Sequence, residues 1–338
     1  MTDLKKLEEE TLAPSPALIR DMQRLDGDLL ILGVGGKMGP SLAVLAKKAL
    51  QQAGKDNAVI GVSRFSDASL VEELEAQEVQ TIKADLLDET QLTALPEAKN
   101  VLFMAGTKFG TTGRESFTWA MNAYLPGRVA EKFRNSRIVA FSTGNVYPYV
   151  PVFSGGATEE TPAGPVGEYA QSCLGRERMF EHFSHKYQTP CLIYRLNYAV
   201  DFRYGVLLEI GRSVLEERKI DLSSGHVNVI WQGDANEYAL RCLHFCESPA
   251  RRLNITGPET VSIRWAAQEF GRLFDKEPNF IGEEQPTALL NNATLAHQLL
   301  GYPSVSLREM IRLLSVWLGS GGETINKPTH FQERKGTY

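Results

Sequence analysis

The chain has 338 residues, of which 43% are hydrophobic and 23% are charged, and its formal net charge is -5. It contains no run of about 20 apolar residues, no basic tract and no apolar N-terminal leader, so we expect a cytoplasmic protein that binds neither membranes nor nucleic acids. Its four cysteines show no zinc-type spacing, and we therefore expect reduced thiols and no metal site.

Short β-branched runs alternate with amphipathic segments over the first 200 residues, a pattern typical of parallel strands connected by helices. Such alternation predicts an α/β fold with a doubly wound parallel sheet. Strands are expected at 28–33, 58–64, 79–85, 100–106, 137–143 and 191–197, and helices at 40–53, 67–77, 116–134 and 166–187.

Beyond residue 200 the alternation weakens, which indicates a smaller mixed lobe that covers the carboxyl edge of the sheet. Strands are expected at 226–231 and 251–257, and helices at 233–246, 262–274 and 305–318. We thus expect an N-terminal extension (1–27), a dinucleotide-binding domain (28–200), a substrate lobe that can interleave with the sheet (201–325) and a tail or surface loop (326–338).

The strongest local signal is the segment "LLILGVGGKMGPSLAVLAKKAL", in which a strand enters a glycine loop and then a helix. Gly33 permits the tight turn, Gly36 lets the backbone approach a pyrophosphate, and Gly39 allows close packing of helix on strand. The pattern predicts a Rossmann-type dinucleotide site. Its expected cofactor contacts here are Gly33, Gly35, Gly36, Lys37, Met38 and Gly39.

The end of the second strand normally distinguishes NAD from NADP, because an acid there binds the ribose 2′-hydroxyl whereas an arginine pairs with a 2′-phosphate. This chain has Ser63 and Arg64 at that point and no acid before Asp67. With Lys37 nearby, two cations favour NADP over NAD. Alternatively, Arg64 is a solvated surface residue and NAD binds.

Five motifs in order carry a resemblance to a known family: the glycine loop, "KADLLDE", "FMAGTK", "FSTGNVYP" and "EYAQS". Together the motifs resemble the extended short-chain dehydrogenase/reductases of the NAD-dependent epimerase/dehydratase type, over residues 28 to 320. The resemblance implies catalytic roles for Tyr169 and Thr143. It also implies cofactor contacts for Asp85, Leu86, Ala105, Gly106, Lys108, Asn122 and Tyr169, and a substrate or cofactor contact for Asn197.

The chemistry of Tyr169 can be argued independently, because hydride transfer at a carbinol carbon needs a group that exchanges the hydroxyl proton. The family has a lysine one turn after the tyrosine, whereas this chain has Cys173. Acting as a base near neutral pH requires the tyrosine pKa to fall by about 3 units, roughly 4 kcal/mol. The oxidised nicotinamide, Lys108 or Arg176 could supply the missing charge, although Arg176 lies two turns, about 10 Å, along the helix. Cys173 is expected to be a buried core thiol.

The substrate is expected at the carboxyl edge of the sheet, near Arg195, Tyr204 and Trp231, where an arginine suits a carboxylate or phosphate. Two functions remain open: an NAD(P)-dependent oxidoreductase or epimerase acting on a sugar, sugar acid or nucleotide sugar, and a catalytically silent cofactor sensor. A cysteine-dependent enzyme using Cys173 is a third. The resemblance also implies a homodimer formed through 116–134 and 166–187.

Overall fold

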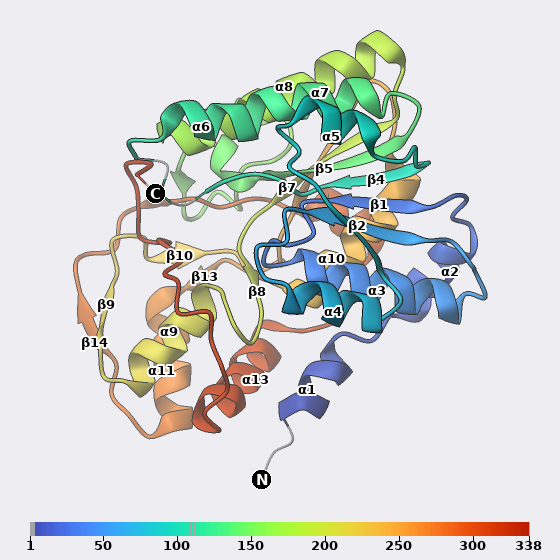
Figure 1. The fold of residues 1–338 in the computed structure, drawn as a ribbon. Coiled ribbons are helices and arrows are strands. Elements are labelled where there is room, and N and C mark those ends of the chain that lie inside the picture. The colour runs from blue at the N-terminus through green and yellow to red at the C-terminus, as the bar shows by residue number, and fades with distance from the viewer. Residues whose placement is uncertain (1–3, 109, 111, 338) are drawn as a thin grey trace.

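A seven-stranded parallel sheet forms the centre of the computed structural model, which describes residues 4–108, 110 and 112–337 (Figure 1). The strand order is β12-β7-β5-β4-β1-β2-β3, and every neighbouring pair is parallel. The order reverses between β1 and β4, the position at which open α/β sheets bind ligands. This confirms the predicted doubly wound α/β fold. The strands are β1 (Leu29–Leu32), β2 (Val59–Ser63), β3 (Gln80–Lys83), β4 (Asn100–Phe103), β5 (Arg137–Thr143), β7 (Cys191–Leu196) and β12 (Arg251–Ile255).

Strand β1 shows why these segments are apolar along their whole length. Leu29 and Ile31 belong to the hydrophobic core on one face of the sheet, whereas Leu30 and Leu32 belong to the core on the other face. All four side chains are fully buried. Because successive side chains of a strand point to opposite faces, a strand covered by helices on both faces needs apolar residues at every position.

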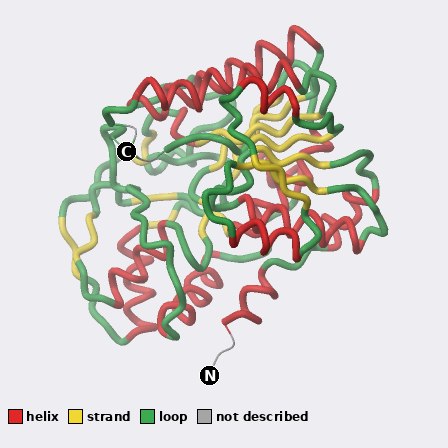
Figure 2. The backbone as a smooth tube through the Cα atoms, in the orientation of Figure 1, coloured by secondary structure: helices red, strands yellow, loops and turns green. Residues whose placement is uncertain are grey.

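Two layers of helices cover the sheet (Figures 1 and 2). One layer contains α2 (Pro16–Gln23), α3 (Gly39–Gln52), α4 (Ser69–Ala76), α10 (Gln232–Arg241) and α12 (Thr294–Leu300). The other contains α5 (Glu89–Ala94), α6 (Glu115–Trp119), α7 (Leu125–Lys132) and α8 (Gly167–Tyr187). A π-helical turn at Ala120–Tyr124 joins α6 to α7, so the helix expected at 116–134 changes its hydrogen-bond spacing in the middle.

A second hydrophobic core lies beside the sheet and is built around Trp231, Phe270 and Trp317. Helices α9 (Val206–Leu215), α11 (Ile263–Phe274) and α13 (Leu307–Gly319) pack around it, and Leu4 and Leu7 of α1 (Leu4–Thr11) contact it. The short strands outside the main sheet are β6 (Val150–Pro151), β8 (Ala199–Val200), β9 (Lys219–Asp221), β10 (His226–Val227), β11 (Ile230–Trp231), β13 (Val261–Ser262), β14 (Asn279–Ile281) and β15 (Thr287–Ala288). Single 3₁₀ turns lie at Gly144–Val146 and Cys242–Phe245.

The six strands predicted in the first 200 residues all exist, and each begins within one residue of its expected start. The prediction of a single strand at 226–231 is wrong, because this segment divides into β10 and β11, which pair with different strands. Strand β12 extends the main sheet by pairing with β7, so the chain returns from the smaller group of elements to the sheet. Helices α1, α2, α5, α9 and α12 were not predicted.

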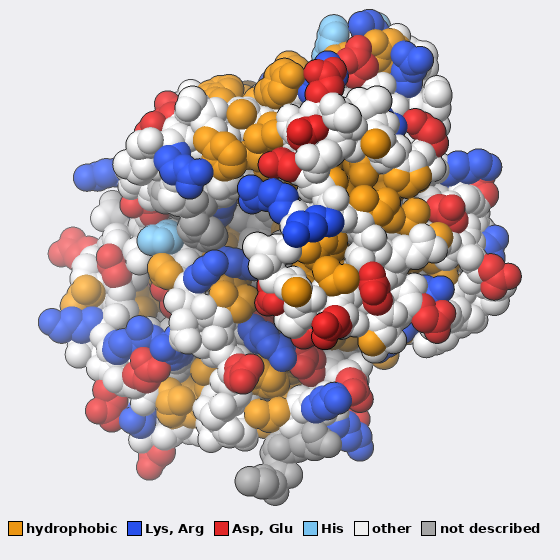
Figure 3. Space-filling view, viewed as in Figure 1, with side chains coloured by type: hydrophobic (Ala, Val, Ile, Leu, Met, Phe, Trp, Pro, Cys, Tyr) orange, Lys and Arg blue, Asp and Glu red, His pale blue; other side chains and the backbone are white. Residues whose placement is uncertain are grey.

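The surface carries charges of both signs, with several Lys and Arg side chains gathered near the middle of the face shown in Figure 3. Within the described residues, no helix combines the length and the apolar character that a bilayer crossing requires.

Candidate functional site

A cavity of about 370 Å³ lies at the carboxyl ends of β1, β4, β5 and β7, at the point where the strand order reverses. It extends from the glycine loop to the first residues of α9. The cavity therefore occupies the place where the strand order leads us to expect a ligand. Its lining includes these predicted site residues: Gly33, Gly36, Lys37, Met38, Gly39, Gly106, Lys108, Thr143, Tyr169, Asn197 and Tyr204.

The glycine loop has the steric features that a dinucleotide cradle needs. Gly33 has a φ of +94°, and a Cβ there would lie 2.6 Å from the backbone nitrogen of Ala105. A Cβ at Gly39 would lie 2.1 Å from the carbonyl oxygen of Val34. Gly36 lines the cavity, and a Cβ there would meet, among the described residues, only the Gly33 carbonyl oxygen at 3.4 Å. Packing thus requires glycine at positions 33 and 39, whereas at position 36 the missing side chain leaves room for a ligand to approach the loop.

The residues expected around the adenosine half of the cofactor lie beyond the cavity, at the ends of β2 and β3. Arg64 is exposed, and a Cβ at Gly35 would lie 2.5 Å from the Ser63 hydroxyl oxygen. The side-chain carboxylate of Asp85 accepts a hydrogen bond from the backbone N–H of Leu87. Leu86 and Ala105 are buried core residues outside the cavity lining.

The side chain of Lys37 points towards Tyr204. Its Nζ is 3.2 Å from the centre of the Tyr204 ring, and both residues line the cavity, whereas no residue of β2 does. Burial, together with the nearby charges of Lys108 and Lys327, lowers the pKa of Lys37 to about 8. Arg64 is not among the charges that act on Lys37, so the structure does not support the expectation that these two cations meet near a ribose 2′ position.

Tyr169, near the start of α8, faces Thr143 at the end of β5. The Tyr169 hydroxyl is within hydrogen-bonding reach of Thr143 and of Cys173, one turn along α8. The Thr143 hydroxyl also donates to Asn145 Oδ1 at 3.0 Å. Burial raises the pKa of Tyr169 well above its ordinary value and Cys173 raises it further, whereas Arg176 and Thr143 lower it.

Cys173 is fully buried, and burial raises its thiol pKa, so the side chain stays neutral near pH 7. The described residues contain no free cysteine that is exposed, since the other three are buried or half-buried. Cys173 is a packing residue beside Tyr169, as expected from the sequence.

Asn122 lies in the π-helical turn and connects the loop after β4 to α8. Its Oδ1 accepts from the backbone N–H of Thr107 at 2.9 Å, and its Nδ2 donates to the Thr107 carbonyl and to the Ser172 hydroxyl. All of its hydrogen-bonding capacity is used inside the protein, which fixes the loop that forms one wall of the cavity. Asn122 itself does not line the cavity.

Arg176 reaches back along α8 towards the cavity. Its Nη1 donates to the Phe141 carbonyl at 2.8 Å, and its Nη2 donates to Asn122 Oδ1 at 2.9 Å. A Cβ at Gly106 would lie 2.3 Å from Nη2, so the guanidinium packs directly beneath a backbone segment that lines the cavity. Long helical side chains point towards the helix N-terminus, which is how this one spans the two turns.

Lys108, in the loop after β4, places its Nζ 5.7 Å from the centre of the Tyr169 ring. Burial lowers its pKa to about 8, and the neighbouring Cys173 acts in the opposite direction. A lysine that approaches the tyrosine ring and lines the cavity is suitably placed to hold an anionic or hydroxyl-rich part of a ligand.

Two residues expected at the substrate are part of the interior instead. Arg195 donates from Nε and Nη2 to the two carboxylate oxygens of Glu177 at 2.9 and 2.6 Å, and its side chain is only 3% exposed. Trp231 packs edge-on against Phe202 in the second core. The substrate roles suggested for Arg195 and Trp231 are wrong, because a residue's position near the end of a strand does not decide which way its side chain turns.

Several lining residues were not anticipated from the sequence. Asn145 follows Thr143 closely, and its amide type next to a predicted catalytic hydroxyl was an available signal. Thr329 gave none, because it comes from the expected tail, where its N–H and hydroxyl donate to Glu209 Oε2 at 2.8 and 2.7 Å. The unpredicted lining residues are Met104, Phe141, Ser142, Asn145, Leu196, Tyr198, Ala199, Gly205, Val206, Gln232 and Thr329.

Comparisons with known proteins agree with this geometry. The profile of the NAD dependent epimerase/dehydratase family matches residues 29–200. No curated protein sequence matches the chain.

Solved structures share the fold at low sequence identity. A UDP-glucuronic acid 4-epimerase from Bacillus cereus, solved with NAD, is 18% identical with a TM-score of 0.71, covering 87% of this chain and 99% of its own. A UDP-glucose 4-epimerase from Thermotoga maritima, solved with UDP-glucose, is 16% identical with a TM-score of 0.71, covering 87% of this chain and 99% of its own. A dTDP-glucose 4,6-dehydratase from Bacillus anthracis, solved with NAD, is 16% identical with a TM-score of 0.72, covering 87% of this chain and 97% of its own. With half of the chain matched by the family profile, the protein belongs to the NAD-dependent epimerase/dehydratase family.

Proposed function

We propose that the protein is an NAD-dependent epimerase or oxidoreductase that transfers hydride at a carbinol carbon of a nucleotide sugar. The observation that supports this most strongly is the single cavity that joins the glycine loop to the Tyr169–Thr143 pair. A cofactor site and a proton-exchanging hydroxyl are therefore within reach of one bound substrate. The family supplies the reaction class, and the related structures contain UDP-glucose or NAD.

The cofactor would lie along the glycine loop, held by the backbone around Gly36 and by Lys108. NAD supplies the hydride acceptor when bound. We propose NAD rather than NADP, because Lys37 faces Tyr204 and leaves Arg64 as the only one of the two expected cations near the end of β2. Related structures also contain NAD.

Tyr169 is the proposed acid and base, and Thr143 holds the reacting oxygen beside it. Since Thr143 has a single proton, which it donates to Asn145 in this structure, it accepts from a substrate hydroxyl or turns its proton towards the substrate oxygen. Asn197 and Tyr204 line the same cavity, where they would contact the sugar.

The test is to incubate the purified protein with NAD and, separately, with UDP-glucose, UDP-glucuronic acid and dTDP-glucose, following the sugars by proton NMR. We expect conversion of at least one sugar, and we expect Tyr169→Phe to lower the rate about 10²- to 10⁴-fold. The affinity for NAD should stay unchanged in that variant, because the cofactor loop is intact.

A second candidate is a cofactor-binding protein without catalytic turnover. It is favoured by one observation: burial raises the pKa of Tyr169, and the residue one turn later is a neutral thiol. Tight NAD binding without conversion of any of these sugars, and with no effect of Tyr169→Phe, would support this candidate over the enzyme.

A further inference from the structure

We propose that Arg176 is the positioning residue that holds a permanent positive charge beside Tyr169, in place of the lysine that the family resemblance leads one to expect at position 173. This inference rests on the proposed role of Tyr169 as the acid and base. It assigns the charge to a residue two turns further along α8, which reaches the site from beneath the cavity floor.

The guanidinium of Arg176 is buried beside neutral groups. Arg176 is 7% exposed, and its hydrogen-bond acceptors within the described part of the chain are the carbonyl of Phe141 and the amide oxygen of Asn122. The adjacent acid, Glu177, is bound at both oxygens by Arg195. Burying a cation without a carboxylate costs stability, so such an arrangement points to a function of the charge itself.

The guanidinium of Arg176 lies close to the cavity without lining it. The guanidinium lies directly under Gly106, which lines the cavity, and the absence of a side chain at Gly106 is what allows this contact. Its Nε is buried and has no partner among the described residues, so the group is not fully satisfied by the protein. The backbone at Gly106 therefore lies between the Arg176 guanidinium and the cavity.

Arg176 differs from the other groups that face Tyr169 in keeping its charge. These groups are Cys173 and Arg176 from α8, Thr143 from β5 and Lys108 from the loop after β4. Cys173 is neutral, and Lys108 has a pKa of about 8, so Lys108 is charged near neutral pH but loses its charge as the pH rises through that value. A guanidinium keeps its charge at every pH at which the protein is folded.

The charge of Arg176 acts on both neighbours, since it lowers the pKa of Tyr169 and the pKa of Cys173. In the holoenzyme it would favour the ionised tyrosine, which is the form needed when the hydroxyl of a sugar is oxidised. Asn122 then has a second role, because its Oδ1 holds the guanidinium in place while its other contacts hold the loop.

The experiment is a pH titration of Tyr169 in the NAD-bound protein, read as the tyrosinate ultraviolet difference between each protein and the same protein carrying Tyr169→Phe. Arg176→Gln keeps a donor for Asn122 but removes the charge, and Arg176→Lys keeps the charge. We expect the pKa of Tyr169 to rise by about one unit or more in Arg176→Gln and to change by less than half of that in Arg176→Lys.

A third variant combines Arg176→Gln with Cys173→Lys and should return the Tyr169 pKa towards its original value, because the charge is restored from another position. A merely structural role for Arg176 would not be rescued in this way. An unchanged Tyr169 pKa in folded Arg176→Gln, or no recovery in the double variant, would overturn the proposal.

This titration needs no turnover, so it decides the role of Arg176 even when no nucleotide sugar is converted and the proposed function fails. Where turnover is measured, Arg176→Gln should move the acidic limb of the kcat profile to higher pH and leave KM for the sugar within about twofold. If kcat of Arg176→Gln falls by the same factor at every pH, the charge of Arg176 does not act on the pKa of Tyr169.

Discussion

At the scale of single residues, the site combines a half-buried tyrosine with two cations of different kinds. Arg176 is held by two hydrogen bonds below the cavity, whereas Lys108 lines the cavity and has a pKa of about 8. The first is suited to a constant electrostatic role, and the second to a direct contact with an anionic ligand. The two roles make different predictions about pH.

The pH dependence of cofactor affinity should follow Lys108. Its pKa of about 8 means that the charged form predominates below pH 8 and is lost as the pH rises through that value; we propose that this charged form attracts the phosphates of the cofactor. We expect NAD affinity, measured by calorimetry, to fall about tenfold between pH 7 and pH 9.

The matched control is Lys37, whose pKa is also about 8 but whose Nζ lies over the Tyr204 ring. Lys108→Met should flatten the pH dependence more than Lys37→Met does. An affinity that is constant across this range in the unaltered protein would contradict the assignment.

At the scale of elements, α8 is the part that organises the site, because it carries Tyr169, Cys173 and Arg176 along one stretch. Its orientation is fixed by the buried pair of Glu177 with Arg195 of β7, to which the Ser142 hydroxyl adds a hydrogen bond of 2.6 Å to Glu177. The sheet and the helix are thus joined at the level of the predicted catalytic residues.

Removing one partner of this pair should be costly. Glu177→Gln leaves the guanidinium of Arg195 buried without its counter-charge, and we expect the free energy of unfolding in urea to fall by about 3–5 kcal/mol. Glu181→Gln on the same helix is the matched control, because the Glu181 pairs with Arg178 and Arg252 are partly exposed and should contribute less than about 1 kcal/mol. Equal losses in the two variants would show that burial of the pair is not the cause.

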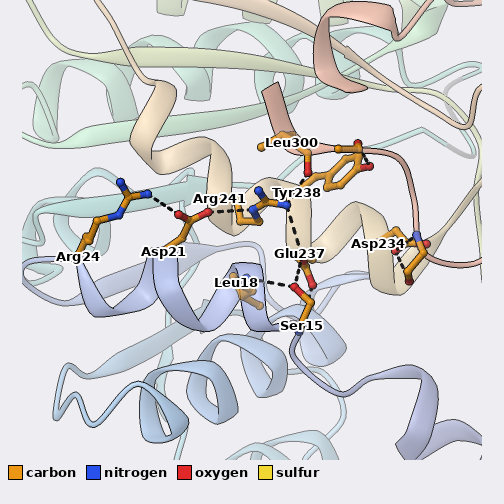
Figure 4. Close-up of polar contacts among 11 residues, drawn as sticks. Ser15, Leu18, Asp21, Arg24, Asp234, Glu237, Tyr238, Arg241 and Leu300 are labelled. Atoms are coloured by element: carbon orange, nitrogen blue, oxygen red, sulfur yellow. Dashed lines mark hydrogen bonds and ion pairs between the residues drawn. The ribbon is translucent and has the colours of Figure 1, made fainter. Parts of the chain in front are cut away.

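At the scale of the whole molecule, the N-terminal extension is part of the fold. Leu18 and Met22 of α2 are fully buried in the main core. Figure 4 shows that α2 is also joined to α10 by polar contacts: Arg241 Nε donates to Asp21 Oδ2 at 2.9 Å, and the Ser15 hydroxyl donates to Glu237 Oε1 at 2.6 Å. Asp234 belongs to the same helix and accepts from Ser304, away from the cavity.

The contact of Asp21 with Arg241 should make stability depend on pH. Burial raises the pKa of Asp21, but hydrogen bonds from Arg241 and Arg24 outweigh it, so the folded pKa is lowered. Its contribution is therefore present above the ordinary aspartate pKa and is lost as the pH falls through the folded value. Arg241→Met should lower the unfolding free energy at pH 7 by roughly 1–3 kcal/mol and reduce its decline between pH 5 and pH 3. If the unfolding free energies of the unaltered protein and of Arg241→Met decline in parallel between pH 5 and pH 3, the Asp21–Arg241 contact is not the cause of the decline.

The C-terminal segment shows the same long-range organisation. Arg334 Nη1 donates to the Thr287 carbonyl at 2.8 Å, and the Tyr149 hydroxyl donates to the Glu333 carbonyl at 2.8 Å. Thr329 reaches the cavity itself. The predicted boundaries at 27, 200 and 325 remain a proposal for the domain organisation, as does the homodimer through the segments 116–134 and 166–187.

The sequence by itself determined the six strands of the first 200 residues, the glycine loop and the elements that carry Tyr169 and Thr143, because each depends on a pattern within one short segment. Only the tertiary structure decided that the Arg176 side chain reaches Phe141, that Arg195 is internal and that Thr329 lines the cavity. These facts depend on contacts between distant residues, such as Arg176 with Phe141, 35 positions apart. A local pattern fixes where a residue stands on its element, but the direction and reach of a long side chain are chosen by the elements that pack around it.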